Sequence, residues 1–316
     1  MKTLRRIVLF LCSAMLLAVS ASAEEAEKTE AGMKVADKIP DEYMASAKDQ
    51  GGKVQTISYP SRDYTKDGAE ITKFALVYLP PDYSEENEYD LLVLCHGIGG
   101  TEREWGFMNL GCIGKNAVDR LILNGEIRPL IIVMPNGRST ANYNDTSFDN
   151  MQSFYVFGEE IRNDLLPYMD AHFATRASKH PDDPDLARMT RSMAGLSMGG
   201  MQTINIGLCE CLDLFSAFGA FSAAPTSYPA ATVAKELEKF PKAEKIRFFY
   251  NICGTNDGTA FASASSAVNK LTEYSDRFDE TNFLWQELPG GHDFNIWYLG
   301  LYNFVRILDT VRYEGE

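Results

Sequence analysis

The sequence predicts an α/β fold with a mostly parallel central sheet and helices on both faces. Two patterns support this prediction. Continuous apolar runs of strand length, such as 90–97 and 130–137, are typical of parallel strands covered on both sides. Segments with apolar residues at helical spacing separate such runs, so strands and helices alternate along the chain. At 316 residues and 45% hydrophobic content, the chain is long enough for one large domain of this kind or two small ones.

The first 52 residues are expected to lie outside that domain. Residues 1–23 combine a basic start, an apolar run and small residues at the end, which is typical of a secretory signal peptide. A membrane anchor is the alternative, although the apolar run is short for a bilayer. Residues 24–52 are acidic and lack an apolar pattern, so we expect an N-terminal leader without a core of its own. The α/β domain is then expected over 53–316.

The domain is expected to begin with two antiparallel strands, 54–61 and 74–80, the second stopped by Pro80 and Pro81. The two apolar runs described above follow as parallel strands. Between them lies a segment long enough for a crossover helix, centred on 116–124.

The second half of the chain continues the alternation. Apolar residues recur every fourth position over 157–173, which predicts a helix with a kink at Pro167. A strand over 191–197 is expected to run directly into a helix over 198–212. The polar and aromatic stretch 138–156 has no period and is interpreted as a surface loop. Further strands are expected within 215–223, 246–254 and 281–290, and a closing helix over 293–309.

Charge and cysteine content exclude several classes of function. The formal net charge of −14 gives an acidic surface that repels phosphate backbones and anionic lipids, so neither nucleic acid nor a membrane is an expected partner. The sequence has no CxxC, HExxH, P-loop or early GxGxxG motif, so no metal, nucleotide or flavin cofactor is expected. We expect the cysteines after Cys12 to be mostly free, buried thiols, with one disulfide possible.

The stretch AGLSMGG, residues 194–200, carries the strongest chemical signal. It fits the G-x-S-x-G pattern and lies between an expected strand and an expected helix, as a nucleophile elbow requires. Gly195 and Gly199 would let neighbouring backbone pass close to the turn. Ser197 is therefore the candidate nucleophile. The alternative is a glycine-rich turn without chemistry.

A serine hydroxyl needs a base, and this architecture places the partners in the order serine, acid, histidine. Of the four histidines only His292 follows Ser197, and it lies between a strand and the last helix. Asp257 is the candidate acid, because it follows an apolar run in the turn Gly254-Thr255-Asn256-Asp257-Gly258. Such a turn also favours Asn-Asp-Gly for conformational reasons alone. Weaker competitors are Asp276, Asp279, Glu280, Glu287 and Asp293.

Two backbone N–H groups are expected to form an oxyanion hole. One belongs to Met198, directly after the nucleophile, where the positive end of the helix begins. The other is expected in the glycine-rich loop that follows the strand 90–97. Ile98 is the preferred donor there, with Gly97 as the alternative. His96 is interpreted as a structural residue rather than a base.

Several motifs together resemble carbohydrate esterase family one, the esterase D-like branch of the α/β-hydrolases, which includes feruloyl and acetylxylan esterases. They are ALVYLPPDYS, LCHGIGGTEREW, AGLSMGGMQT, CGTNDG and GGHDFNIW, and the match runs in order from about Lys53 to Arg312. The resemblance implies an α/β-hydrolase fold and a triad at the serine of GLSMGG, the aspartate of GTNDG and the histidine of GGHD. These are the residues reached above by order and elimination. It also implies ester substrates on plant cell-wall xylan, often hydroxycinnamates on arabinose.

The sequence identifies the acyl group of the substrate less closely than it identifies the triad. A hydroxycinnamate needs an apolar slot beside the serine. Gly97, Trp105, Tyr228 and Trp297 are the candidate substrate contacts, and Tyr143 and Trp285 are further candidates. The expected function is a secreted serine carboxylesterase that acts on feruloylated or acetylated xylan or its oligosaccharides.

Other functions were weighed against this one. An acetyl-specific pocket would be smaller, so an acetylxylan or general short-chain esterase is the first alternative. Relatives of S-formylglutathione hydrolase and a mycolyltransferase-like acyl transferase are further alternatives within enzymes. A carbohydrate-binding protein without chemistry is disfavoured, because none of the three triad positions is broken.

Overall fold

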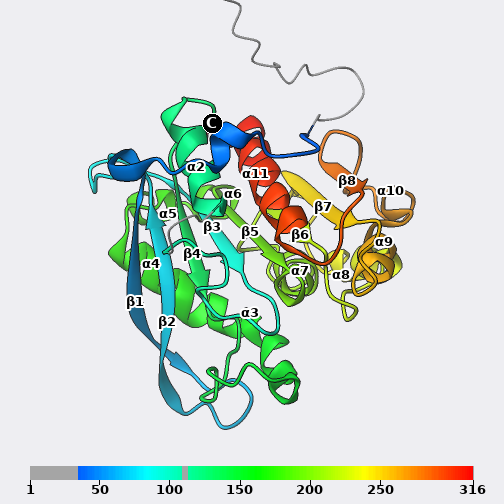
Figure 1. The fold of residues 1–316 in the computed structure, drawn as a ribbon. Coiled ribbons are helices and arrows are strands. Elements are labelled where there is room, and N and C mark those ends of the chain that lie inside the picture. Colours follow the sequence, from blue (N-terminus) through cyan, green and yellow to red (C-terminus); the bar gives the residue numbers. More distant parts are fainter. Residues whose placement is uncertain (1–34, 109–112, 316) are drawn as a thin grey trace, which may run out of the picture.

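The computed structural model describes residues 35–108 and 113–315 and contains one eight-stranded sheet in the order β1-β2-β4-β3-β5-β6-β7-β8 (Figure 1). β1 pairs antiparallel with β2, and β2 with β4, whereas all pairs from β4 to β8 are parallel. The predicted α/β class is confirmed. The strands are β1 (Lys53–Arg62), β2 (Glu70–Leu79), β3 (Asp90–Cys95), β4 (Leu130–Pro135), β5 (Arg191–Leu196), β6 (Ala217–Phe221), β7 (Phe248–Gly254) and β8 (Phe283–Leu288).

Helices cover both faces of the sheet because the central strands are apolar on both sides. α2 (Ile113–Leu123) and α11 (Phe294–Thr310) pack together on one face, over a core that includes Leu92 and Leu94 (Figure 1). The other face is covered by α3 (Phe157–Glu160), α4 (Leu166–His172), α8 (Ala230–Leu237) and α9 (Phe261–Val268), over a core that includes Leu91 and Val93. The alternation of neighbouring residues between two cores follows from the two-residue period of a strand.

Shorter elements complete the chain. The short helices are α1 (Asp41–Met44), α5 (Arg176–Lys179), α6 (Pro184–Met189), α7 (Met198–Gln202) and α10 (Leu271–Tyr274). The 3₁₀ segments are η1 (Lys48–Gln50) and η2 (Phe148–Phe154), and the π-helical segments are η3 (Ile161–Leu165) and η4 (Thr203–Leu208). No helix among the described residues is long and apolar enough to cross a membrane.

The kink expected at Pro167 takes the form of a π-helical stretch, because η3 separates α3 from α4. Proline has no backbone N–H and crowds the carbonyl four residues earlier. The turn before it therefore widens, and the helix regains its α-helical pattern afterwards.

The prediction of a surface loop over 138–156 is wrong for both of its ends. Arg138, Ser153 and Phe154 are buried, and η2 occupies the second half. The amide of Gln202, on the nucleophile helix, donates to the carbonyls of Gly137 and Phe154 at 2.9 Å each. A side chain rather than a neighbouring strand thus provides hydrogen bonds to these backbone carbonyls, which allows the segment to be irregular. The segment lies against the helix that follows the nucleophile.

The domain starts earlier than the predicted boundary at residue 53. Asn303 of α11 accepts the N–H of Ala36 at 3.0 Å and donates to its carbonyl at 2.9 Å. Further along, Gly52 donates to Asp119 at 2.8 Å. Residues 35–52 are therefore part of the folded domain rather than a leader without contacts. The expected signal peptide, 1–23, lies outside the described residues.

The four described cysteines, Cys95, Cys209, Cys211 and Cys253, are free and buried. The fifth cysteine of the expected mature chain, Cys112, lies outside the described residues. Burial raises the pKa of all four thiols, so these side chains stay protonated at neutral pH.

Candidate active site

Ser197 lies at the bend between β5 and α7 in a strained conformation. Its φ of 50° and ψ of −113° are rare for a residue with a side chain. Backbone hydrogen bonds on both sides hold it there: its N–H donates to Phe221 at 2.9 Å, and its carbonyl accepts from Ala224 at 3.0 Å. A strained serine between a strand and a helix is what a nucleophile elbow requires.

Two glycines make this bend sterically possible. A Cβ at Gly195 would lie 2.6 Å from the carbonyl group of Gly199, and a Cβ at Gly199 would lie 2.5 Å from the carbonyl oxygen of Cys95. The backbones of β5, α7 and β3 therefore pack directly against one another, with no room for a side chain between them. Larger residues at either position would push the serine out of place.

Three side chains distant in the sequence meet in a hydrogen-bonded line. The Oγ of Ser197 lies 3.0 Å from Nε2 of His292, and Nδ1 of His292 lies 2.8 Å from Oδ2 of Asp257. The residues follow β5, β8 and β7, and all three strands run parallel in one sheet. Their carboxyl ends share one edge, so the topology brings the three loops together.

Asp257 is held as a carboxylate in a nearly closed environment, being 2% exposed. Its Oδ1 accepts the N–H groups of Thr259 and Ala260 at 3.0 and 2.8 Å. Burial acts to raise the pKa of Asp257, but hydrogen bonds from His292 and Ala260 outweigh it and hold that pKa below its usual value. The ionised acid can therefore orient the imidazole and stabilise its protonated form.

Two indole rings near the triad are buried. Trp297 is 7% exposed and meets the His292 ring edge-on, with centroids 5.1 Å apart. Trp105 is fully buried among Phe221, Phe294 and Tyr298, and its Nε1 donates to the carbonyl of Cys95 at 3.1 Å.

The prediction that Trp105 contacts substrate is therefore wrong, because the ring belongs to the core. Of the four candidate contacts, Tyr228 is the exposed aromatic one, at 37%. Of the two further candidates, Tyr143 is half-buried near the Lys73 ammonium, and Trp285 packs on Phe261.

The two candidate oxyanion donors flank Ser197. Met198 is the first residue of α7, where an N–H has no partner within the helix. In the loop after β3, the N–H of Gly97 donates to Glu104 at 2.6 Å and is therefore occupied. The N–H of Ile98 has no hydrogen-bond partner within 35–108 and 113–315. This geometry favours Ile98 over Gly97 as the second donor.

His96 has no free nitrogen for catalysis. Its Nε2 accepts the N–H of Gly137 at 3.0 Å, so Nδ1 carries the proton and donates to the carbonyl of Gly97 at 2.6 Å. Burial, together with the nearby Arg138 guanidinium, lowers the pKa of His96 to about 3. A neutral imidazole that holds backbone on both sides fits the structural role expected of it.

Several residues around the serine were not singled out by the sequence reasoning. Glu104 and Arg138 bind the loop 96–100 after β3, called here the oxyanion loop because it carries Ile98. Arg138 lies in the stretch that was interpreted as a surface loop. An apolar cluster adjoins the nucleophile, and its methionines and aromatics in 151–155 were the available signal. It comprises Phe154, Met198, Met201 and Ala224, with Ile98, Met151 and Tyr155 packed against it.

No group of three metal-ligating side chains occurs among the described residues.

The sheet order, the strained serine and the hydrogen-bonded line behind it are those of an α/β-hydrolase fold with a serine–histidine–aspartate triad. The comparisons with known proteins agree. The chain belongs to the esterase family, because the family model described as "Putative esterase" matches residues 72–297.

Two curated relatives carry similar sequences. Endo-1,4-beta-xylanase Y of Acetivibrio thermocellus is 28% identical over 266 residues, which is 79% of this chain and 22% of the relative. An endo-1,4-beta-xylanase/feruloyl esterase of Xylanibacter ruminicola is 29% identical over 251 residues, which is 77% of this chain and 30% of the relative. The chain thus spans less than a third of either relative's length.

Solved structures show the same fold. The feruloyl esterase module of Clostridium thermocellum, complexed with sinapinate, has a TM-score of 0.73 at 24% identity and covers 92% of this chain and 99% of that one. A CE1 ferulic acid esterase of Anaeromyces mucronatus has a TM-score of 0.69 at 22% identity, with coverage of 86% and 97%. These comparisons confirm the esterase family and the fold expected from the resemblance to carbohydrate esterase family one.

Proposed function

We propose that this chain is a secreted feruloyl esterase-type enzyme that removes hydroxycinnamate groups from xylan or its oligosaccharides. The observation that carries the proposal is the unbroken line from Ser197 through His292 to Asp257, with contacts of 3.0 and 2.8 Å. The relatives' names supply the substrate class, since one is a xylanase/feruloyl esterase and one structure holds sinapinate.

The reaction would proceed in two halves. Ser197 Oγ attacks the ester carbonyl while Nε2 of His292 takes the hydroxyl proton. The bond to the alcohol then breaks, and His292 returns the proton to the leaving sugar oxygen. Water attacks the resulting acyl-serine with His292 again as base, and this releases the free acid and the serine.

The charge that develops on the carbonyl oxygen would be stabilised by the N–H groups of Met198 and Ile98. Each such donor is worth about 2.7–4 kcal/mol of barrier in related chemistry. Asp257 keeps the imidazole in the tautomer that accepts from Ser197, since it binds Nδ1. It also offsets the positive charge that His292 carries during attack.

An aromatic acyl group is favoured over acetate by three half-buried apolar side chains, Ile98, Met151 and Tyr155, which pack against the buried cluster next to the serine. The carbonyl of Ser197 accepts the N–H of Ala224, which fixes one side of that cluster beside the nucleophile. Flat hydrophobic rings gain more from such a surface than a methyl group does. A small acetyl group would leave it unfilled.

A panel of methyl hydroxycinnamates and short acetyl esters tests this proposal. We expect faster turnover on ferulate or sinapinate esters than on acetyl esters, and near-complete loss in Ser197→Ala with an unchanged circular dichroism spectrum. A preference for acetyl esters would instead support an acetylxylan or short-chain esterase. Full activity of Ser197→Ala would overturn the triad assignment. N-terminal sequencing of the protein exported by its host tests secretion and cleavage after residue 23.

A further inference from the structure

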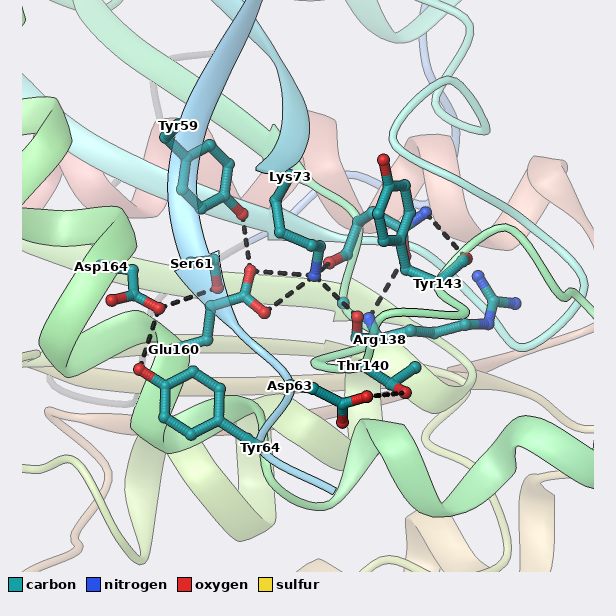
Figure 2. A network of polar contacts seen from close by, with 12 residues as sticks. Tyr59, Ser61, Asp63, Tyr64, Lys73, Arg138, Thr140, Tyr143, Glu160 and Asp164 are labelled. Carbon is teal, nitrogen blue, oxygen red and sulfur yellow. Dashed lines mark hydrogen bonds and ion pairs between the residues drawn. The ribbon is translucent and has the colours of Figure 1, made fainter. Parts of the chain in front are cut away.

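Three charged side chains that the proposed mechanism does not use are fully buried: Lys73, Arg138 and Glu160. Burying charge is costly unless each group is paired and hydrogen-bonded. Lys73 Nζ lies 2.8 Å from Glu160, and Tyr59 donates to the same carboxylate at 2.6 Å (Figure 2). The pair is satisfied within the protein, so the question is what it holds in place.

The remaining donors of Lys73 go to the backbone that leaves β4. Its Nζ donates to the carbonyls of Asn136 and Arg138 at 3.0 and 2.7 Å. Figure 2 shows the carbonyl of Arg138 facing Lys73 while its side chain extends the other way. A lysine on β2 therefore fixes where the Arg138 side chain starts, at the same sheet edge as the triad.

The guanidinium of Arg138 ends on the oxyanion loop. It donates to the carbonyl of Gly100 at 2.8 Å and to the carbonyl of Ile98. It also lies over the ring of Phe154 at 4.8 Å from its centroid, which orders the side chain further. One planar group thus clamps two carbonyls of a loop that is rich in glycine and would otherwise be adaptable.

Two further backbone groups of this loop, both of Gly97, are held by side chains. His96 donates to the carbonyl of Gly97, and the N–H of Gly97 donates to Glu104. Since a trans peptide points its N–H opposite to its C=O, the bond from His96 fixes the direction of the Ile98 N–H. Arg138 fixes the next peptide through the Ile98 carbonyl. Ile98 therefore sits between two peptide planes that are both held.

We propose that Arg138 is a positioning residue for the oxyanion hole: anchored through its backbone by the buried Lys73–Glu160 pair, it clamps the carbonyls of Ile98 and Gly100 so that the Ile98 N–H stays directed at the reacting carbonyl. The inference rests on the proposed function, since it concerns the same site. Arg138 itself touches no reacting atom. Its effect is on the barrier to attack and not on substrate binding.

The test compares Arg138→Met with Arg188→Met. Arg188 is a matched control, because it is also buried and also clamps two carbonyls, those of Leu212 and Lys245, in a different part of the fold. We expect Arg138→Met to lower kcat by a factor on the order of 10² with little change in KM. A phenylboronic acid, which forms a tetrahedral adduct on serine, should lose affinity in parallel, while product ferulate should not. Arg188→Met should lose thermal stability but keep kcat within about threefold.

Arg138→Lys keeps the charge but offers one ammonium in place of the fork, so we expect intermediate kcat and boronate affinity. If Arg138→Met does not fold, the Arg138→Lys variant tests the positioning role in its place. Unchanged kcat and boronate affinity in a folded Arg138 variant would overturn the positioning role while leaving the esterase intact. No hydrolysis of any ester by the wild-type chain would overturn the proposed function and this inference with it.

Discussion

Trp297 stands edge-on to His292, with an angle of 88° between the two rings and 5.1 Å between their centroids. The indole is almost fully buried at the start of α11, whereas the imidazole lies on the short loop before that helix. A rigid ring thus supports the side chain that must shuttle the proton.

Removing that support should slow the chemistry without weakening binding. We expect Trp297→Leu to lower kcat by about 10-fold while KM stays near wild type, because a small displacement of a base is costly. Steady-state kinetics on the preferred ester measure both constants. A rise in KM with unchanged kcat would instead indicate that Trp297 contacts substrate, as the sequence suggested.

Asp257→Asn should reduce kcat by about 10⁴-fold, because an amide cannot hold the imidazole in the tautomer that accepts from Ser197. Glu280→Gln is the control: it removes an exposed carboxylate that follows the triad acid in sequence, and should leave kcat unchanged. Loss of activity in the control, or its retention in Asp257→Asn, would argue for a different acid.

The same variant has a pH-dependent effect on stability. The pKa of Asp257 lies below its ordinary value of 3.8 in the folded protein, so its ionisation favours the folded state. That contribution is present above about pH 4 and is lost as the pH falls through the folded-state pKa. We expect the gap in urea midpoint between wild type and Asp257→Asn to shrink from pH 7 to pH 3. A gap that widens on acidification would contradict the assignment.

Trp105 should contribute to the stability of the fold and not to the binding of substrate. Trp105→Phe leaves the carbonyl of Cys95 without its donor, at a cost of about 1–3 kcal/mol in the free energy of unfolding. KM for hydroxycinnamate esters should stay within twofold. Tyr228→Ala, at the exposed candidate contact, should show the reverse, with a raised KM and an unchanged unfolding midpoint. Urea denaturation and steady-state kinetics on both variants separate the two roles.

Removing one partner of the buried ion pair should destabilise the fold more than removing both charges. Lys73→Met leaves Glu160 as an uncompensated buried charge, and we expect a loss of about 3–5 kcal/mol in the free energy of unfolding. Adding Glu160→Gln removes that charge, keeps an acceptor for Tyr59, and should recover part of the loss. A double-mutant cycle measures the coupling. Lys242→Met, in an exposed pair, should leave the midpoint near wild type.

The triad could be placed from the sequence because its chemistry uses rare residues in a fixed order. Only one histidine follows Ser197, and parallel strands bring the loops of Asp257 and His292 to one edge. Aromatic side chains carry no such constraint. Trp105 follows a glycine loop in the chain, yet its side chain is fully buried in the core, and nothing in the sequence indicates that burial.

The support around the oxyanion loop was invisible for a related reason. A lysine in a strand, such as Lys73, normally indicates a solvent face, and Arg138 in a polar stretch indicates a surface loop. Their burial depends on mutual contacts between segments far apart in the chain. Only the assembled fold shows that Lys73 pairs with Glu160 and that Arg138 binds the carbonyls of Ile98 and Gly100.

The contact between Ala36 and Asn303 has a practical consequence for recombinant work. A shortened version that begins at Lys53 would discard both hydrogen bonds to Asn303 and the one from Gly52 to Asp119. It would also uncover part of the apolar core shared by α2 and α11, against which Val35, Ile39 and Tyr43 pack. Expression trials should therefore cut upstream of Val35, where trimming removes none of these contacts.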